Sequence, residues 1–96
     1  MASFVILGRW TSQGIQKIEE GPKRLDEVKE AFQDRGVQTK SFHLTLGRYD
    51  FVMTVEAKNS ETLAAAILSV VSKGNASTET LRAFTEGEYR SIVKEL

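Results

Sequence analysis

Strand-like and helix-like segments alternate along this chain in an order that few folds can accommodate. Short apolar or alternating runs predict strands at residues 3–9, 37–46, 49–56 and 78–84. Apolar residues at helical spacing predict one helix between the first two strands and another between the last two. With right-handed crossovers, this β-α-β-β-α-β order predicts an α+β, ferredoxin-like antiparallel sheet with its helices on one face.

Capping residues predict where the helices begin and end. Thr11 or Ser12 caps a first helical turn, which restarts at Gly21-Pro22 and ends at Gly36. Further caps are predicted at Asn59 or Ser60, at Gly74, and in a capping box formed by Thr85 and Glu88. The capping box predicts that a short C-terminal helix follows the last strand.

The short length and the absence of cysteine limit what else the chain can be. Its 96 residues predict a single domain over 1–96 with a thin core. Without cysteine neither a disulfide nor a thiolate metal site can form, which favours a reducing compartment. Because the helices cover one face of the sheet, we expect the other face to be covered in a homodimer or a higher homo-oligomer.

The charge balance argues against two classes of partner. Lysine plus arginine equals aspartate plus glutamate at 13 each, so we expect no nucleic-acid partner. The apolar run near the N-terminus is too short for a signal sequence or for a membrane span of about 20 residues. We therefore expect a cytoplasmic protein with no membrane partner.

The segment from Ser41 to Glu56 predicts a β-hairpin. If Gly47-Arg48 is a two-residue turn, His43 lies opposite Val52. One face of this hairpin then carries the apolar set Phe42, Leu44, Leu46, Tyr49, Phe51 and Met53, which we expect to join the core. The opposite face carries Ser41, His43, Thr45, Asp50, Val52 and Thr54.

His43 and Asp50 are the only catalytic candidates on this polar face. A carboxylate beside an imidazole could fix its tautomer and make His43 a general base. Alternatively, Asp50 accepts hydrogen bonds from Thr45 or from turn amides while His43 lies at the surface. One histidine beside one carboxylate is too few ligands for zinc, so no metal and no cofactor are predicted.

Ligand-binding candidates are Trp10, Thr45, Asp50 and Arg82. Trp10 could stack on a ligand or pack at the edge of the core. Arg82 could hold an anion through its planar guanidinium or form an intersubunit salt bridge.

Three stretches of the sequence resemble the small bacterial proteins of the GYD-domain family: GRWTSQGIQKIEEGPKRL, LGRYDFV and GNASTETLRAFTEGEY. The Gly-x-Tyr-Asp segment of that family maps to Gly47, Tyr49 and Asp50. The resemblance implies a dimeric α/β-barrel, in which two ferredoxin-like sheets pack face to face, and no assigned activity.

Two functional hypotheses follow. The first is a non-enzymatic homo-oligomeric module for small-molecule binding or assembly, with a cavity lined by the polar hairpin face and Arg82. The alternative is a cofactor-independent enzyme, monooxygenase-like or isomerase-like, that uses His43 and Asp50. No nucleophile, metal set or phosphate loop accompanies that pair, which favours the first hypothesis.

Overall fold

A computed structural model describes all residues from 1 to 96. The strands are β1 (Ala2–Trp10), β2 (Gln38–Leu44), β3 (Phe51–Ala57) and β4 (Ala76–Ala83). The helices are α1 (Ser12–Gln16), a 3-10 turn at Ile18–Glu20, α2 (Gly21–Asp34), α3 (Ser60–Val71) and α4 (Glu86–Lys94).

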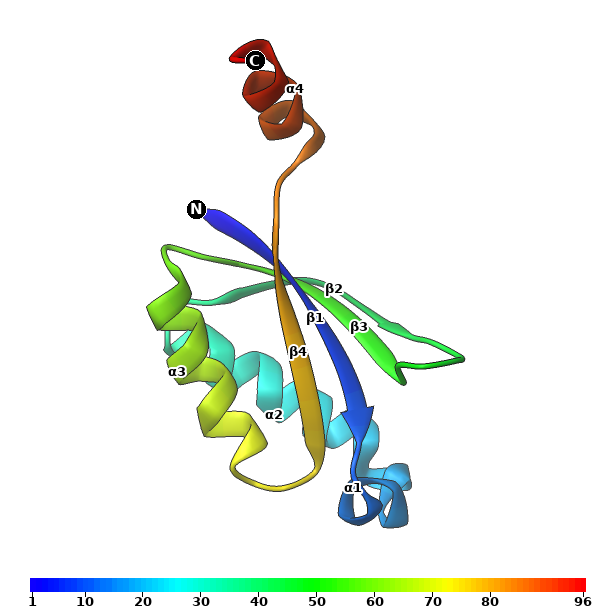
Figure 1. Ribbon diagram of the computed structural model, residues 1–96. Helices are drawn as coiled ribbons and strands as arrows, with labels where there is room; N and C mark the ends of the chain where they lie inside the picture. Colours follow the sequence, from blue (N-terminus) through cyan, green and yellow to red (C-terminus); the bar gives the residue numbers. More distant parts are fainter.

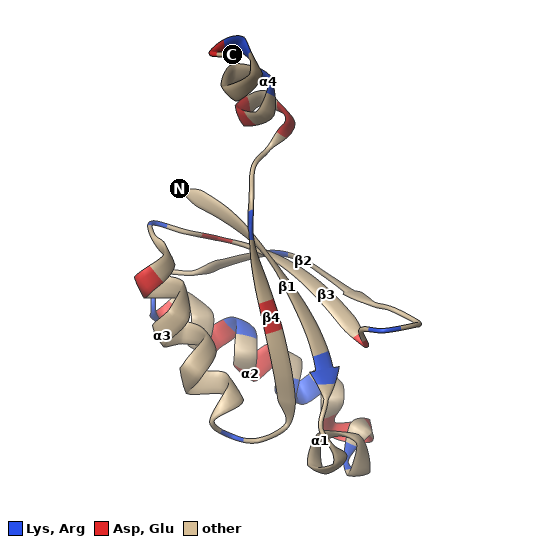
Figure 2. Ribbon diagram, in the orientation of Figure 1, with Lys and Arg blue, Asp and Glu red and all other residues tan.

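The four strands form one antiparallel sheet in the order β2-β3-β1-β4. Helices α2 and α3 lie side by side on the same face of this sheet (Figure 1). The predicted ferredoxin-like α+β fold is therefore confirmed, and β1 is one of the two central strands. Figure 2 shows positive and negative positions interspersed along α2 and around the sheet.

The capping residues begin the helices where the sequence predicts. Thr11 accepts a hydrogen bond from the N–H of Gly14, and Asn59 accepts one from the N–H of Thr62. Gly36 and Gly74 both have φ of +84°, a conformation that glycine adopts without a Cβ clash. Thr85 and Glu88 form the predicted capping box at the start of α4.

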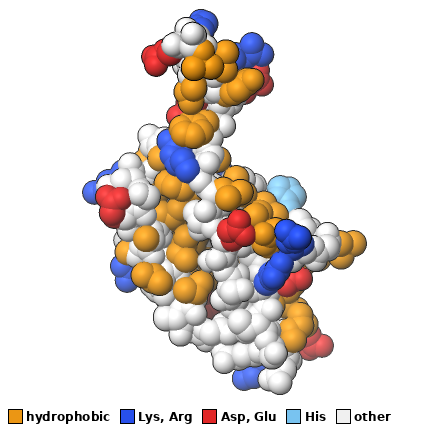
Figure 3. All heavy atoms as spheres, viewed as in Figure 1, with side chains coloured by type: hydrophobic (Ala, Val, Ile, Leu, Met, Phe, Trp, Pro, Cys, Tyr) orange, Lys and Arg blue, Asp and Glu red, His pale blue; other side chains and the backbone are white.

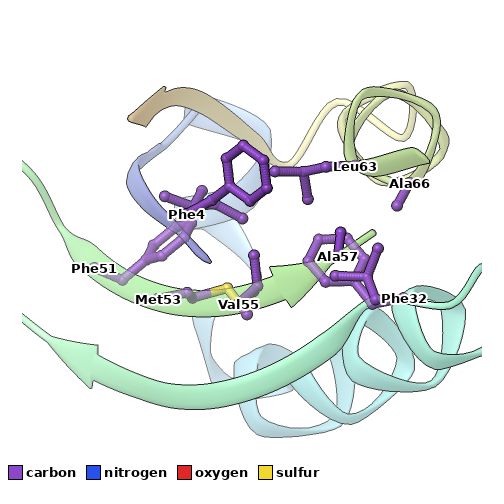
Figure 4. Close-up of a cluster of buried hydrophobic side chains, with 10 residues drawn as sticks. Phe4, Phe32, Phe51, Met53, Val55, Ala57, Leu63 and Ala66 are labelled. Carbon is purple, nitrogen blue, oxygen red and sulfur yellow. The ribbon is translucent and has the colours of Figure 1, made fainter. Parts of the chain in front are cut away.

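The core lies between the sheet and the helices α2 and α3. It contains Phe4, Ile6, Phe32, Val37, Phe51, Met53, Val55, Ala57, Leu63 and Ala66 (Figure 4). Trp10 and Phe42 pack against this set as half-buried residues. The core is thin, as expected for a chain of this size.

The hairpin between β2 and β3 departs from the prediction at its tip. The pairing of His43 with Val52 is as predicted, but β2 ends at Leu44 and β3 begins only at Phe51. Strict alternation of faces stops where the strands end, so Leu44 and Leu46 are 66% and 98% exposed. The expectation that they join the core is wrong, because the hairpin tip projects beyond the helix layer (Figure 1).

Candidate functional site

The sheet face opposite the helices, called the open face below, has an apolar centre. Strand register places Val5 opposite Leu81, and Leu7 opposite Val52. These four residues form a patch over two neighbouring rows of the strands β3, β1 and β4. All four keep some solvent exposure because neither α2 nor α3 covers this face.

A polar cluster lies at one end of the open face. The hydroxyl of Tyr49 donates a hydrogen bond to Oε1 of Glu79 at 2.7 Å. The guanidinium of Arg9 lies 5.1 Å from the centre of the Tyr49 ring, and its Nε donates to the carbonyl of Arg48. The hydrogen bond to Glu79 raises the pKa of Tyr49 above its usual value, since it favours the protonated phenol.

The predicted position of Tyr49 in the core is therefore wrong. Its ring lies on the open face, where it borders a hollow of about 210 Å³ together with Leu7, Arg9 and Glu79. The physical reason is that the loop leaves the strand alternation just before β3, which frees Tyr49 to reach the carboxylate on β4.

Asp50 has a structural partner. Its Oδ2 accepts a hydrogen bond from the backbone N–H of Trp10 at 3.0 Å. Its own N–H donates to the carbonyl of Gly8 at 2.8 Å. No hydrogen bond joins Asp50 to His43, which is exposed on β2. The geometry thus provides no oriented His–Asp pair.

Thr45 stabilises the hairpin loop. Its hydroxyl donates to the carbonyl of Tyr49 at 2.7 Å, and its N–H donates to the carbonyl of Asp50 at 2.9 Å. Both bonds hold the two sides of the loop together. The side chain of Thr45 is thereby used in the turn.

Arg82 lies at the far end of the sheet from Trp10 and Asp50. It pairs with Phe4 across β1 and β4, about 20 Å of strand away from Trp10. Its guanidinium bonds to the carbonyls of Ser3 and Ala83 and lies 4.3 Å from the Phe84 ring centre. Arg82 therefore lies apart from the other three candidates, because Asp50 is bonded to Trp10 and to Thr45 at the opposite end of the sheet.

A cavity lies on the opposite side of the sheet, between the strands and the helices α2 and α3. It measures about 610 Å³, and most of its lining residues are hydrophobic. Trp10 is the one sequence candidate in its wall, where its ring packs 5.7 Å from that of Phe51. Periodicity alone did not predict this cavity, because an apolar helix face looks the same over a cavity as over a filled core.

The C-terminal arm, residues Phe84–Leu96, contains the predicted C-terminal helix, but the sequence did not predict that this helix lies apart from the body. This helix, α4, stands clear of the sheet and of the other helices (Figure 1) and has no buried residue. The exposed apolar residues of the arm are Phe84, Tyr89, Ile92, Val93 and Leu96. Figure 3 shows hydrophobic side chains on α4, apart from those of the body.

None of the helices is both long and apolar enough to cross a membrane. The family model for the GYD domain matches residues 4–93. The chain belongs to the GYD domain family. In this GYD chain the Gly-x-Tyr-Asp segment is the hairpin loop described above. The phenol of Tyr49 donates a hydrogen bond to Glu79, and the carboxylate of Asp50 accepts one from the N–H of Trp10.

Comparison with curated proteins gives a relative from Thermus thermophilus named glutamine synthetase and cystathionine beta-lyase binding protein. It is 37% identical over 84 residues, which cover 86% of the GYD chain and 88% of the relative. This chain is thus similar over nearly its whole length to a protein named for binding two enzymes.

Two solved structures are similar in fold. The leucine response regulatory protein LrpA of Mycobacterium tuberculosis gives a TM-score of 0.65 at 15% identity, over 88% of the GYD chain. The GYD chain spans only 51% of LrpA, and this likeness shows the fold alone. The solved structure of a Thermus thermophilus protein gives a TM-score of 0.57 at 25% identity, with 88% of this chain and 95% of that one covered.

Proposed function

We propose that this GYD chain is a non-enzymatic, cytoplasmic binding protein that self-associates and holds a metabolic enzyme with its C-terminal arm. The observation that carries the proposal is α4, an amphipathic helix whose apolar face packs on nothing in its own chain (Figure 1). The name of the Thermus relative supports a protein partner, and glutamine synthetase and cystathionine β-lyase are the partners to test first.

The apolar residues of α4, together with Leu96 just past its end, recur at the spacing by which helices bind in grooves. Tyr89, Ile92, Val93 and Leu96 stand at i, i+3, i+4 and i+7, so they form one stripe. Their exposed fractions run from 45% for Val93 to 101% for Leu96. A partner groove would remove this stripe from water, which stabilises the complex by roughly 25 cal/mol for each Å² of apolar surface buried.

The contacts just before α4 hold this helix where a partner can reach it. Arg82 stacks over Phe84 and bonds to the carbonyl of Ser3, which fixes the base of the arm on β1. The capping box of Thr85 and Glu88 then starts the helix beyond the edge of the body. A helix that is formed before binding loses less conformational entropy on docking.

The open face supports self-association. Its apolar centre of Val5, Leu7, Val52 and Leu81 is bordered by polar residues that include Glu79 and Thr54. An apolar centre with a polar rim is typical of protein interfaces. Two such sheets can pack about 10 Å apart with the same patch on both copies.

Binding of the enzyme is tested with variants of α4. Isothermal titration of the two enzymes, purified from the same source as this chain, measures the affinity directly. We expect Ile92→Asp to weaken binding tenfold or more, because a carboxylate would then enter the apolar contact. A tenfold loss of affinity corresponds to about 1.4 kcal/mol of binding free energy. The matched control is Ser91→Asp, which adds the same charge beside the stripe and should bind like the wild type.

Because α4 is separate from the core, Ile92→Asp leaves the body folded, and circular dichroism confirms this for each variant. Equal affinity of Ile92→Asp and Ser91→Asp, or no binding of either enzyme by the wild type, would overturn the proposed role of the arm.

Self-association is tested by sedimentation. We expect Leu7→Arg on the open face to give monomers at concentrations where the wild type and the α2 surface variant Gln33→Arg are dimers or larger. A wild type that sediments as a monomer throughout would refute the homo-oligomer.

A further inference from the structure

We propose that the cavity between the helix layer and the sheet binds a small apolar carboxylic acid, with its tail against Trp10 and its carboxylate at Arg24 and Lys73. This site goes beyond the protein-binding function proposed above and uses none of the residues of the C-terminal arm. Its failure and the failure of that function are therefore separate results.

The shape and lining of the cavity suit a ligand tail. Its volume of about 610 Å³ falls within the roughly 300–1,000 Å³ of small-molecule sites. Its walls come from α2 on one side, α3 on the other and the sheet beneath. The apolar wall residues include Val28, Ile67, Val70, Ile6, Phe42 and Phe51.

Two cationic residues of the cavity lining, Arg24 and Lys73, come from segments that both contact α1. Nη2 of Arg24 donates to the carbonyl of Gly14 at 2.9 Å, and Nε2 of Gln13 donates to the carbonyl of Lys73 at 2.8 Å. Gly14 and Gln13 both belong to α1. The start of α2 and the α3–β4 turn therefore both lie at the α1 end of the molecule (Figure 2).

The charges at this end favour an acid. Arg24 and Lys73 line the cavity with a single carboxylate, Glu27. The one salt bridge of the chain joins Arg90 to Glu86, so neither lining cation is neutralised by an ion pair. The remaining N–H groups of Arg24 and the ammonium of Lys73 can donate charge-assisted hydrogen bonds to a carboxylate.

A single acid with an aliphatic or aromatic tail fits within 610 Å³. Water alone is a poor occupant because the walls offer it few hydrogen-bonding partners.

Trp10 makes the proposal directly testable, since it is the only tryptophan of the chain and lies in the cavity wall. We expect hexanoate, octanoate and decanoate, kept below the concentrations at which they aggregate, to change Trp10 fluorescence saturably. Affinity should rise about fourfold per methylene, which corresponds to about 0.8 kcal/mol for each buried CH₂. Decanol and decylammonium should bind more weakly than decanoate.

Two variants locate the ligand. Ala31→Phe places a ring in the cavity and should weaken decanoate binding at least tenfold, whereas Ala65→Phe makes the same change on the exposed surface of α3 and should not. Lys73→Gln should remove most of the preference for decanoate over decanol. It keeps the apolar walls intact, so it tests the site even where Ala31→Phe fails to fold.

Three results would overturn the proposal. They are no change in Trp10 fluorescence with any of the acids, equal decanoate binding by Ala31→Phe and Ala65→Phe, and an unchanged preference for decanoate in Lys73→Gln. A Trp10 emission that shifts with protein concentration alone would assign the cavity to a second copy of the chain and overturn it as well.

Discussion

The carboxylate of Asp50, one residue before β3 begins, accepts a hydrogen bond from the backbone N–H of Trp10 at 3.0 Å. The N–H of Asp50 donates in turn to the carbonyl of Gly8 at 2.8 Å. Asp50 thus continues the ladder between β1 and β3 with a side chain in place of a carbonyl. The aspartate of the GYD segment ties the hairpin loop to the end of the central strand.

This contact predicts a loss of stability on truncation of Asp50. Asp50→Ala leaves the partly buried N–H of Trp10 without an acceptor, and we expect it to lower the free energy of unfolding by about 1–3 kcal/mol. Asp50→Asn keeps an acceptor oxygen and should lose less. Urea denaturation followed by Trp10 fluorescence measures both changes.

The control for Asp50 is Asp26→Ala, which removes an exposed carboxylate from α2 and should change stability by less than about 0.5 kcal/mol. Equal midpoints for Asp50→Ala and Asp26→Ala would contradict a structural role for the Trp10 contact.

The fold was predictable because its signals are local. Thr11, Asn59 and Thr85 each cap the helix that follows them, and each acts on an N–H within three residues. The register of His43 with Val52 follows from the turn at Gly47, whose φ is +121°. Interactions between residues so close along the chain can be predicted from the sequence alone.

The site was predicted less well because its contacts are distant in sequence. Tyr49 lies on the open face through a hydrogen bond to Glu79, thirty positions along the chain. Asp50 was predicted to bond to Thr45 or turn amides or to orient His43, but its partner is the N–H of Trp10 on β1. The cavity depends on the spacing between helices and sheet, for which periodicity carries no signal.

The second prediction concerns the titration of Tyr49. The hydrogen bond to Glu79 raises the pKa of the phenol above about 10, its value in an unfolded chain. The bond therefore contributes its full stabilisation below that value and loses it as the pH rises through the higher pKa of the folded state. We expect Glu79→Gln to lower the pKa of Tyr49, measured by tyrosinate absorbance in a Tyr89→Phe background.

In that experiment Glu56→Gln is the control, because Glu56 lies on β3 away from the phenol. The hydrogen bond would be refuted as the cause of the raised pKa if both glutamate variants shifted the titration equally.

The third prediction concerns the close approach of α1 to the α3–β4 turn. A Cβ on Gly14 would lie 2.0 Å from the backbone carbonyl oxygen of Asn75, which cannot move without breaking its hydrogen bond from Thr11. We expect Gly14→Ala to destabilise the protein by about 1–3 kcal/mol. Thermal denaturation is the measurement.

Gly21→Ala is the matched control, since its Cβ would meet only the tip of Ile18 at 3.8 Å. Alanine is also the better helix former at this position in the first turn of α2, so this variant should be neutral or slightly more stable than the wild type. Similar losses in both variants would show that the contact with Asn75 is not the cause.

The last prediction separates the stability of α4 from that of the body. The hydroxyl of Thr85 accepts from the N–H of Glu88, and the Glu88 carboxylate accepts from the N–H of Thr85, which lowers the pKa of Glu88. Thr85→Ala should cost helix α4 about 1 kcal/mol and increase its fraying. The melting temperature of the body should stay unchanged, because α4 buries none of its residues.

Carbon chemical shifts in α4, measured by NMR, follow this fraying residue by residue. In the wild type the stabilising bond to the Glu88 carboxylate is present above the unfolded pKa of about 4.3 and is lost as the pH falls through the lower pKa of the folded state. Helix α4 should therefore fray in acid before the sheet unfolds, and Glu88→Gln should remove that pH dependence. A single transition shared by α4 and the sheet would mean that the arm is packed on the body in solution.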